Sequence, residues 1–208
     1  MTENDGIQNE FSYLTPQVEL HVILNLIDVL LENFEKIDPK SHLYLLFKAN
    51  CLYEKKDFSS SSFLFLRILT EKYDCKDLLT QKKNSNFVPL LAKIISSLLN
   101  SFKYSEALVL IQLLNTKSFP QKVVFLQLVT DNVKFLDPFY FRFIWDISIL
   151  EILLHKFAYF ENSENVSLIT SLISKPQLNQ SNSRKTKKMM KQKLIQDFIE
   201  KIQLSLHK

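Results

Sequence analysis

The segment Phe139–His155 reads FYFRFIWDISILEILLH and contains the only tryptophan of the 208-residue chain, Trp145. Its apolar side chains recur at the three- and four-residue intervals of one helix face, at Phe139, Phe143, Ile147, Leu150 and Leu154. Four more widen that face, namely Phe141, Ile144, Trp145 and Ile149. A helix that is apolar on most sides needs neighbours on several sides, so the spacing predicts one helix over 139–155 inside a stack of helices.

The composition of the chain also favours helices. It is 46% hydrophobic and contains a single glycine, Gly6. Strand-rich folds use glycine in hairpin turns and bulges. Phosphate-binding loops need several glycines so that backbone N–H groups can approach the ligand, and no such loop can be written here. Nucleotide binding by those routes is therefore excluded.

Apolar periodicity predicts helices along most of the chain. A start at Thr15-Pro16 leads into an apolar stripe from Leu20 to Phe34. Further helices are expected over 120–136 and from about Lys187 to the end. Two other segments, 41–73 and 89–117, each show two helical patterns separated by a short polar turn.

These two segments resemble tetratricopeptide units, which are helical hairpins with a small residue where the helices cross. Ser61 and Ala107 occupy that position, 46 residues apart. We therefore predict an all-α fold, a short α-solenoid of tetratricopeptide-like helical hairpins. We expect the stacked hairpins to bury nearly all apolar side chains.

The predicted domain organisation has four parts. Residues 1–15 form a disordered lead, and 16–160 form the helical-repeat domain. Residues 161–183, rich in Asn and Ser, form a polar linker in which 166–173 could be a short helix. Residues 184–208 form a basic amphipathic helix that packs on the solenoid.

The sequence contains no arrangement typical of a catalytic or metal site. Cys51 and Cys75 lie 24 residues apart, whereas a zinc site needs four closely spaced N or S donors. Glu151 and His155 form one carboxylate–imidazole pair, but di-iron bundles repeat such pairs. No nucleophile, base and acid converge either. We predict no catalytic residue, no cofactor and no metal, and hence a protein that is not an enzyme.

Membrane insertion is not expected, because charged residues interrupt every long apolar stretch before it reaches the ~20 residues of a span. The first ten residues are polar and acidic, unlike a signal peptide. Two cysteines suit a reducing, intracellular compartment. We expect a soluble protein.

Basic residues concentrate near the carboxy terminus. Residues 184–193 hold six of the 26 Lys and Arg, and the remaining 20 face 22 acidic residues. Three interpretations are open: a solvated helix face, a nuclear import signal, or a contact to nucleic acid or an acidic partner.

The carboxy-terminal third resembles Integrator complex subunit 8. The similarity lies in the pairs Trp145-Asp146 and Leu150-Glu151, the polar link Leu178-Asn179-Gln180, and the basic stretch that leads into a closing helix, Arg184 to Leu206. It covers mainly 139–206, with looser similarity from 89 onward. That family is also built of tetratricopeptide-like pairs, and its members are several times longer.

The resemblance implies a non-catalytic scaffold in a nuclear complex that processes small nuclear RNA and attenuates transcription. Its partners would be other protein subunits, with nucleic-acid contact indirect or weak through 184–193, and no membrane or small-molecule substrate. The expected partner-binding residues are Trp145, Asp146, Glu151, Arg184, Lys185, Lys187, Lys188, Lys191 and Lys193. Two alternatives remain: a cytoplasmic helical-repeat adaptor in trafficking or protein turnover, and an RNA-binding helical protein.

Overall fold

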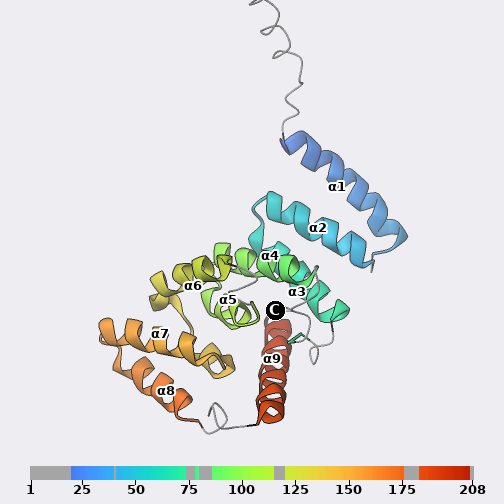
Figure 1. Ribbon diagram of the computed structural model, residues 1–208. Helices are drawn as coiled ribbons and strands as arrows, with labels where there is room; N and C mark the ends of the chain where they lie inside the picture. The colour runs from blue at the N-terminus through green and yellow to red at the C-terminus, as the bar shows by residue number, and fades with distance from the viewer. Residues whose placement is uncertain are drawn as a thin grey trace, which may run out of the picture.

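The computed structural model describes residues 20–39, 41–73, 78–79, 86–114, 120–175 and 183–206. Every regular element in these ranges is helical, and the helices follow one another in an arc (Figure 1). The predicted all-α solenoid is therefore confirmed. The first element, α1 (Leu20–Ile37), begins where the description begins, so the expected lead over 1–15 and the helix start at Thr15-Pro16 lie outside the described residues.

Three helical hairpins make up most of the arc. They are α2 (His42–Glu54) with α3 (Phe58–Lys72), α4 (Phe87–Asn100) with α5 (Tyr104–Ile111), and α7 (Ile147–Tyr159) with α8 (Ser163–Ile173). The first two coincide with the hairpins predicted over 41–73 and 89–117. Helix α8 falls inside the segment expected to be a polar linker, where Ile169 and Leu172 are buried against the core. The predicted domain limits themselves stay predictions.

The three hairpins turn in the same way. The second residue after the first helix of each hairpin has a positive φ: 63° at Lys56, 61° at Phe102 and 56° at Glu161. In each turn the next backbone N–H donates to the carbonyl five residues back, as in the bond of 2.8 Å from Lys103 to Leu98. This is the Schellman ending of a helix, which glycine usually supplies. The chain makes all three turns with residues other than glycine.

Small side chains allow the helices to approach one another. Ser61 of α3 and Ser97 of α4 are both fully buried, and their hydroxyl oxygens lie 3.3 Å apart. Ala107 of α5 is also fully buried. Larger side chains at these positions would separate the helix axes, so the small residues determine how closely consecutive helices stack.

The single helix predicted over 139–155 is wrong. Instead, a 3₁₀ helix η4 (Pro138–Phe143) is followed by three extended residues, 144–146, and α7 begins at Ile147. An aspartate caps the start of each of the two helices. The Asp137 carboxylate accepts from the Phe139 N–H, and the Asp146 carboxylate accepts from the Ser148 N–H. The helix expected over 120–136 is likewise divided into α6 (Gln121–Asp131) and the short 3₁₀ helix η3 (Val133–Phe135).

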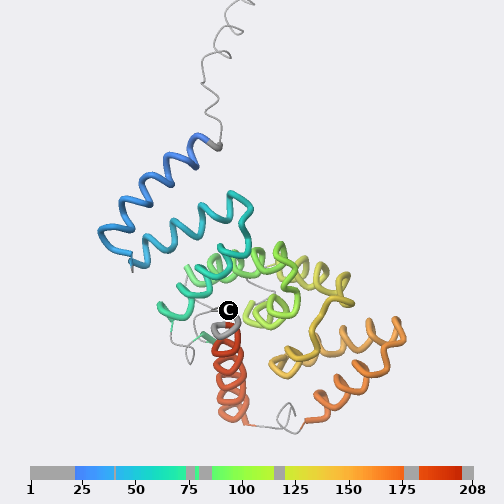
Figure 2. Tube along the Cα trace, turned by 180° about the vertical axis from the view of Figure 1, so that it is seen from behind, coloured from blue at the N-terminus to red at the C-terminus, as the bar shows by residue number. Residues whose placement is uncertain are grey.

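The last helix, α9 (Arg184–Leu206), returns to the middle of the arc, as both backbone views show (Figures 1 and 2). Ser183 directly precedes the helix, and its hydroxyl accepts the Thr186 N–H. In its carboxy-terminal half, the Phe198 side chain is fully buried. The centre of its ring lies 6.1 Å from that of Tyr140 and 5.7 Å from that of Phe143. Helix α9 therefore packs on η4, and it also contacts α3 of the first hairpin.

Candidate interaction surfaces

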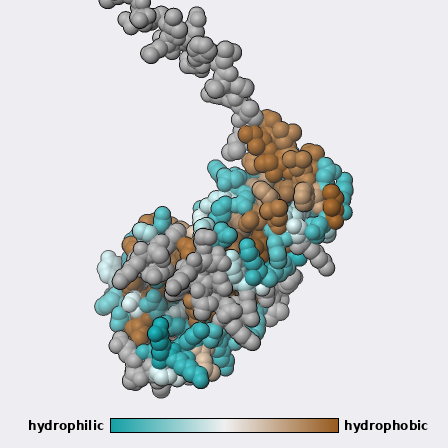
Figure 3. Space-filling view, turned by 45° about the vertical axis from the view of Figure 1, so that its right-hand side comes forward, coloured by the Kyte–Doolittle hydropathy of each residue, from teal (hydrophilic) through white to brown (hydrophobic). Residues whose placement is uncertain are grey.

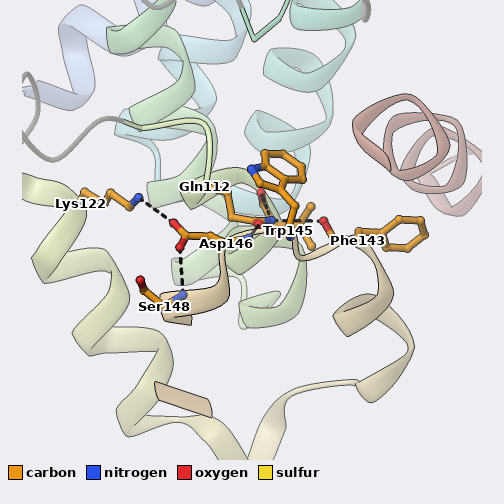
Figure 4. A network of polar contacts seen from close by, with 7 residues as sticks. Gln112, Lys122, Phe143, Trp145, Asp146 and Ser148 are labelled. Atoms are coloured by element: carbon orange, nitrogen blue, oxygen red, sulfur yellow. Dashed lines mark hydrogen bonds and ion pairs between the residues drawn. The ribbon is translucent and has the colours of Figure 1, made fainter. Parts of the chain in front are cut away.

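The extended residues 144–146 are held by the side-chain amide of Gln112, which is buried near the end of α5 (Figure 4). Its oxygen accepts from the backbone N–H groups of Trp145 and Asp146, at 2.7 and 3.0 Å. Its nitrogen donates to the carbonyls of Val109 and Phe143, at 3.1 and 3.3 Å. One side chain thus satisfies the backbone groups that the interruption between η4 and α7 leaves without helical partners.

Trp145 and Asp146 are part of this support. The Trp145 side chain is buried, with 7% of the residue exposed. One oxygen of Asp146 caps α7 and the other lies 3.6 Å from the Nζ of Lys122, whose side chain is only 10% exposed (Figure 4). These contacts position the start of α7. Partner binding by Trp145 and Asp146 stays a prediction, and direct contact with the tryptophan ring would require it to leave its site.

The other predicted contact residues lie at the surface. Glu151 is exposed on α7. On α9, Arg184, Lys185, Lys188 and Lys193 are exposed, and Lys187 and Lys191 are half-buried. The structure brings one of the six, Lys193, together with basic residues from other elements.

That meeting point is a groove of about 690 Å³ between η4, α8 and α9. We call it the α9 groove. Its lining residues are Arg142, Ile144, Leu172, Lys175, Thr186, Met189, Met190, Lys193, Leu194 and Asp197. Arg142 is fixed at its edge, because its Nε donates to the Phe139 carbonyl at 2.9 Å and its guanidinium carbon lies 3.9 Å from the Phe139 ring centre. Such stacking orients the charge without neutralising it.

A second surface lies at the other end of the arc, on α1 and α2. Its apolar side chains are each 37–79% exposed, and Figure 3 shows the hydrophobic colour gathered at this projecting end. We call it the hairpin surface, made of Val22, Ile23, Leu26, Val29, Leu30, Phe34 and Ile37 of α1 with Leu43, Leu46 and Phe47 of α2. The expectation that nearly all apolar side chains are buried is therefore wrong.

Helix α1 packs on α2 through ion pairs together with the apolar side chains Leu24 and Leu31. Glu35 lies 3.2 Å from the Lys48 Nζ, and Asp28 forms an ion pair with Lys55. Leu24 is buried beside them, whereas Leu30, on the other side of the helix, is 65% exposed. The apolar stripe read from the sequence is thus wider than α2 can cover, and half of it faces outward.

The ion pairs between α1 and α2 change the acidity of the carboxyl groups. The hydrogen bond from Lys55 lowers the pKa of Asp28 below its ordinary value. A hydrogen bond with Tyr44, and then the bond from Lys48, lower the pKa of Glu35 in the same way. Both carboxylates are stabilised in the ionised form, so the docking of α1 depends on their charge.

Within the described ranges, no three His, Cys, Asp or Glu side chains come together as metal ligands would. Among the same residues, no helix combines the length and the apolar character needed to cross a bilayer. Cys51 is buried beside Asp28, and burial raises the pKa of its thiol, which disfavours the reactive thiolate.

Reasoning from the sequence missed both surfaces. Arg142 and Lys175 lie in different segments from the basic cluster, and only the fold brings them to Lys193. The hairpin surface did leave a signal. Asp28 and Glu35 are seven residues apart and therefore lie on one side of the helix, whereas Leu26 and Leu30 lie on the opposite side.

In a comparison with protein families, a family model matches nearly the whole chain. The model of the family described as "INTS8, TPR repeats", the tetratricopeptide repeats of Integrator complex subunit 8, matches residues 6–200. The match extends well before residue 89, where the resemblance seen in the sequence begins, and includes α1 and α2. No curated protein matches the chain significantly.

Proposed function

The chain belongs to the tetratricopeptide-repeat family of Integrator complex subunit 8, and on that premise we propose that it is a non-catalytic scaffold of an Integrator-like complex in the nucleus. It would hold other protein subunits of an assembly that processes the 3′ ends of small nuclear RNA and attenuates transcription. The observation that carries this proposal is the family match over residues 6–200.

The hairpin surface supports a scaffold role. Contiguous exposed apolar side chains on a soluble domain are typical of protein–protein interfaces. Subunits that stay associated bury larger and more apolar surfaces than transient partners do. Leu26 and Leu30, at 62% and 65% exposure, lie at the centre of α1 and point away from α2. We propose that another subunit covers them.

The predicted contact residues take two roles in this proposal. Glu151 and the basic side chains of α9 are exposed or half-buried and would contact partners directly. Trp145 and Asp146 would act indirectly, because their contacts with Gln112 and Lys122 hold the start of α7 in place.

The proposal is tested by affinity purification of the tagged full chain from its own cells, followed by mass spectrometry. We expect other Integrator subunits in the wild-type sample and their loss in a Leu26→Glu/Leu30→Glu variant. Asn25→Glu is the matched control, because it adds a carboxylate to an exposed polar position of the same helix. Circular dichroism should show equal helix content in all three proteins.

Two results would overturn the proposal. One is a purified chain that carries no Integrator subunit. The other is an exclusively cytoplasmic signal when the tagged chain is imaged, which would favour a helical-repeat adaptor in trafficking or protein turnover.

A further inference from the structure

The α9 groove is cationic. Arg142 from η4, Lys175 after α8 and Lys193 of α9 line it together with a single carboxylate, Asp197. Among the described residues, no ion pair joins any of these three cations to an acidic side chain. Three like charges brought to one groove repel one another unless an anionic group is placed between them. The charge of the groove therefore favours an acidic ligand.

The floor of the groove is apolar. Ile144 and Leu172 are 3% and 5% exposed and form part of the core, and Met189 at the edge is 61% exposed. Met190 and Leu194 continue this floor along α9. Methionine side chains are flexible and adapt to differently shaped apolar partners. The ligand should therefore carry apolar side chains as well as carboxylates.

The groove is less suited to nucleic acid. Proteins that bind single strands combine basic residues with aromatic rings on which bases stack. None of the groove's lining residues is aromatic, and the Phe139 ring is covered by the Arg142 guanidinium. Carboxylates on an apolar scaffold match the groove better than phosphates on bases do.

From these observations we infer that the α9 groove binds an acidic amphipathic segment of a partner protein. The partner's carboxylates pair with Arg142, Lys175 and Lys193, and its apolar side chains pack on Met189 and Met190. A short helix laid into a groove is one established mode of such recognition. The site lies apart from the hairpin surface, so this inference and the proposed scaffold function can fail independently.

Helix α9 supplies a matched control for the test. Thr186, Met189, Met190, Lys193 and Asp197 lie on one side of the helix and line the groove. Lys185 and Lys188 are also exposed but lie outside the lining. Reversing two charges in the groove, with Lys175→Glu/Lys193→Glu, changes the net charge as much as Lys185→Glu/Lys188→Glu does outside it.

The experiment measures binding to the full chain by fluorescence anisotropy. The probe is a labelled amphipathic peptide with glutamates on one helix face and leucines on the other. A peptide with lysines in place of the glutamates and a labelled oligouridylate serve as comparisons. We expect the wild type to bind the acidic peptide, the groove variant to bind it about tenfold more weakly, and the control variant to change affinity by less than about twofold.

Three results would overturn the inference. The first is no binding of the acidic peptide to the wild type. The second is an equal loss in both variants, which indicates diffuse attraction to a positive helix. The third is oligouridylate binding that exceeds peptide binding and disappears in the groove variant, which makes the groove a nucleic-acid site. Circular dichroism and the Tm of both variants must match the wild type for the comparison to count.

Discussion

The backbone N–H of Trp145 donates a 2.7 Å hydrogen bond to the side-chain oxygen of Gln112, a residue 33 positions earlier in the chain. This contact connects the end of the second hairpin to the start of the third. It also explains why the most apolar segment of the chain is interrupted at 144–146: the N–H groups that would otherwise bond within a helix have a buried partner elsewhere.

Replacing Gln112 with leucine should destabilise the fold by about 2 kcal/mol, because the Trp145 and Asp146 N–H groups and the Phe143 carbonyl lose a buried partner. The measurement is denaturant unfolding followed by circular dichroism. Gln127→Leu is the control, since Gln127 is exposed and bonds to Asp131 on its own helix. It should cost less than about 0.5 kcal/mol. Equal losses would contradict the support that we assign to Gln112.

The Ser61→Leu substitution should destabilise the fold by about 2 kcal/mol, because the larger side chain must fit between α3 and α4 where Ser61 meets Ser97. Ser59 lies two positions away on α3 and is exposed. The same substitution there should change stability by less than about 0.5 kcal/mol. Urea unfolding of both variants measures the difference, and a tolerated Ser61→Leu would show that the helices can separate at this point.

The turn at Lys56 offers a gain in stability. Its φ of 63° disfavours any residue with a Cβ atom, and glycine accepts it freely. Lys56→Gly should therefore raise the free energy of unfolding by about 0.5–1 kcal/mol. Lys56→Val should lower it, because a branched side chain resists positive φ most strongly. The opposite order of the two variants in chemical denaturation would contradict the left-handed turn.

The docking of α1 should weaken in acid. Asp28 and Glu35 have pKa values lowered on folding from ordinary values of 3.8 and 4.5. A carboxyl group of this kind stabilises the folded state above its unfolded pKa, and the contribution is lost as the pH falls through the lowered folded value. Below about pH 4.5 the wild type should therefore lose more stability than an Asp28→Asn/Glu35→Gln variant. Denaturant unfolding at pH 7 and pH 3 compares the two, and parallel losses would show that the ion pairs contribute nothing.

Much of the fold could be predicted because its signals are local. The hairpins over 41–73 and 89–117 follow from apolar spacing on either side of short polar turns, and both are confirmed. The prediction of one continuous helix over 139–155 was wrong, because the spacing of apolar residues reflects only which side chains are apolar. That spacing contains no information about Gln112, which lies far away in the chain and accepts hydrogen bonds from the N–H groups of residues 145 and 146. The basic cluster on α9 was visible in the sequence, but its meeting with Arg142 and Lys175 was not.

The sequence by itself determined the helical class of this protein, the positions of its first two hairpins and the concentration of positive charge near its end. These properties depend on residues within one or two helical turns of each other. Tertiary structure alone decided where the helix expected over 139–155 is interrupted, which side of α1 faces outward and where the three cations of the α9 groove meet. Those outcomes depend on contacts between residues far apart in the chain, whose free energy depends on which groups the folded chain brings together and removes from water.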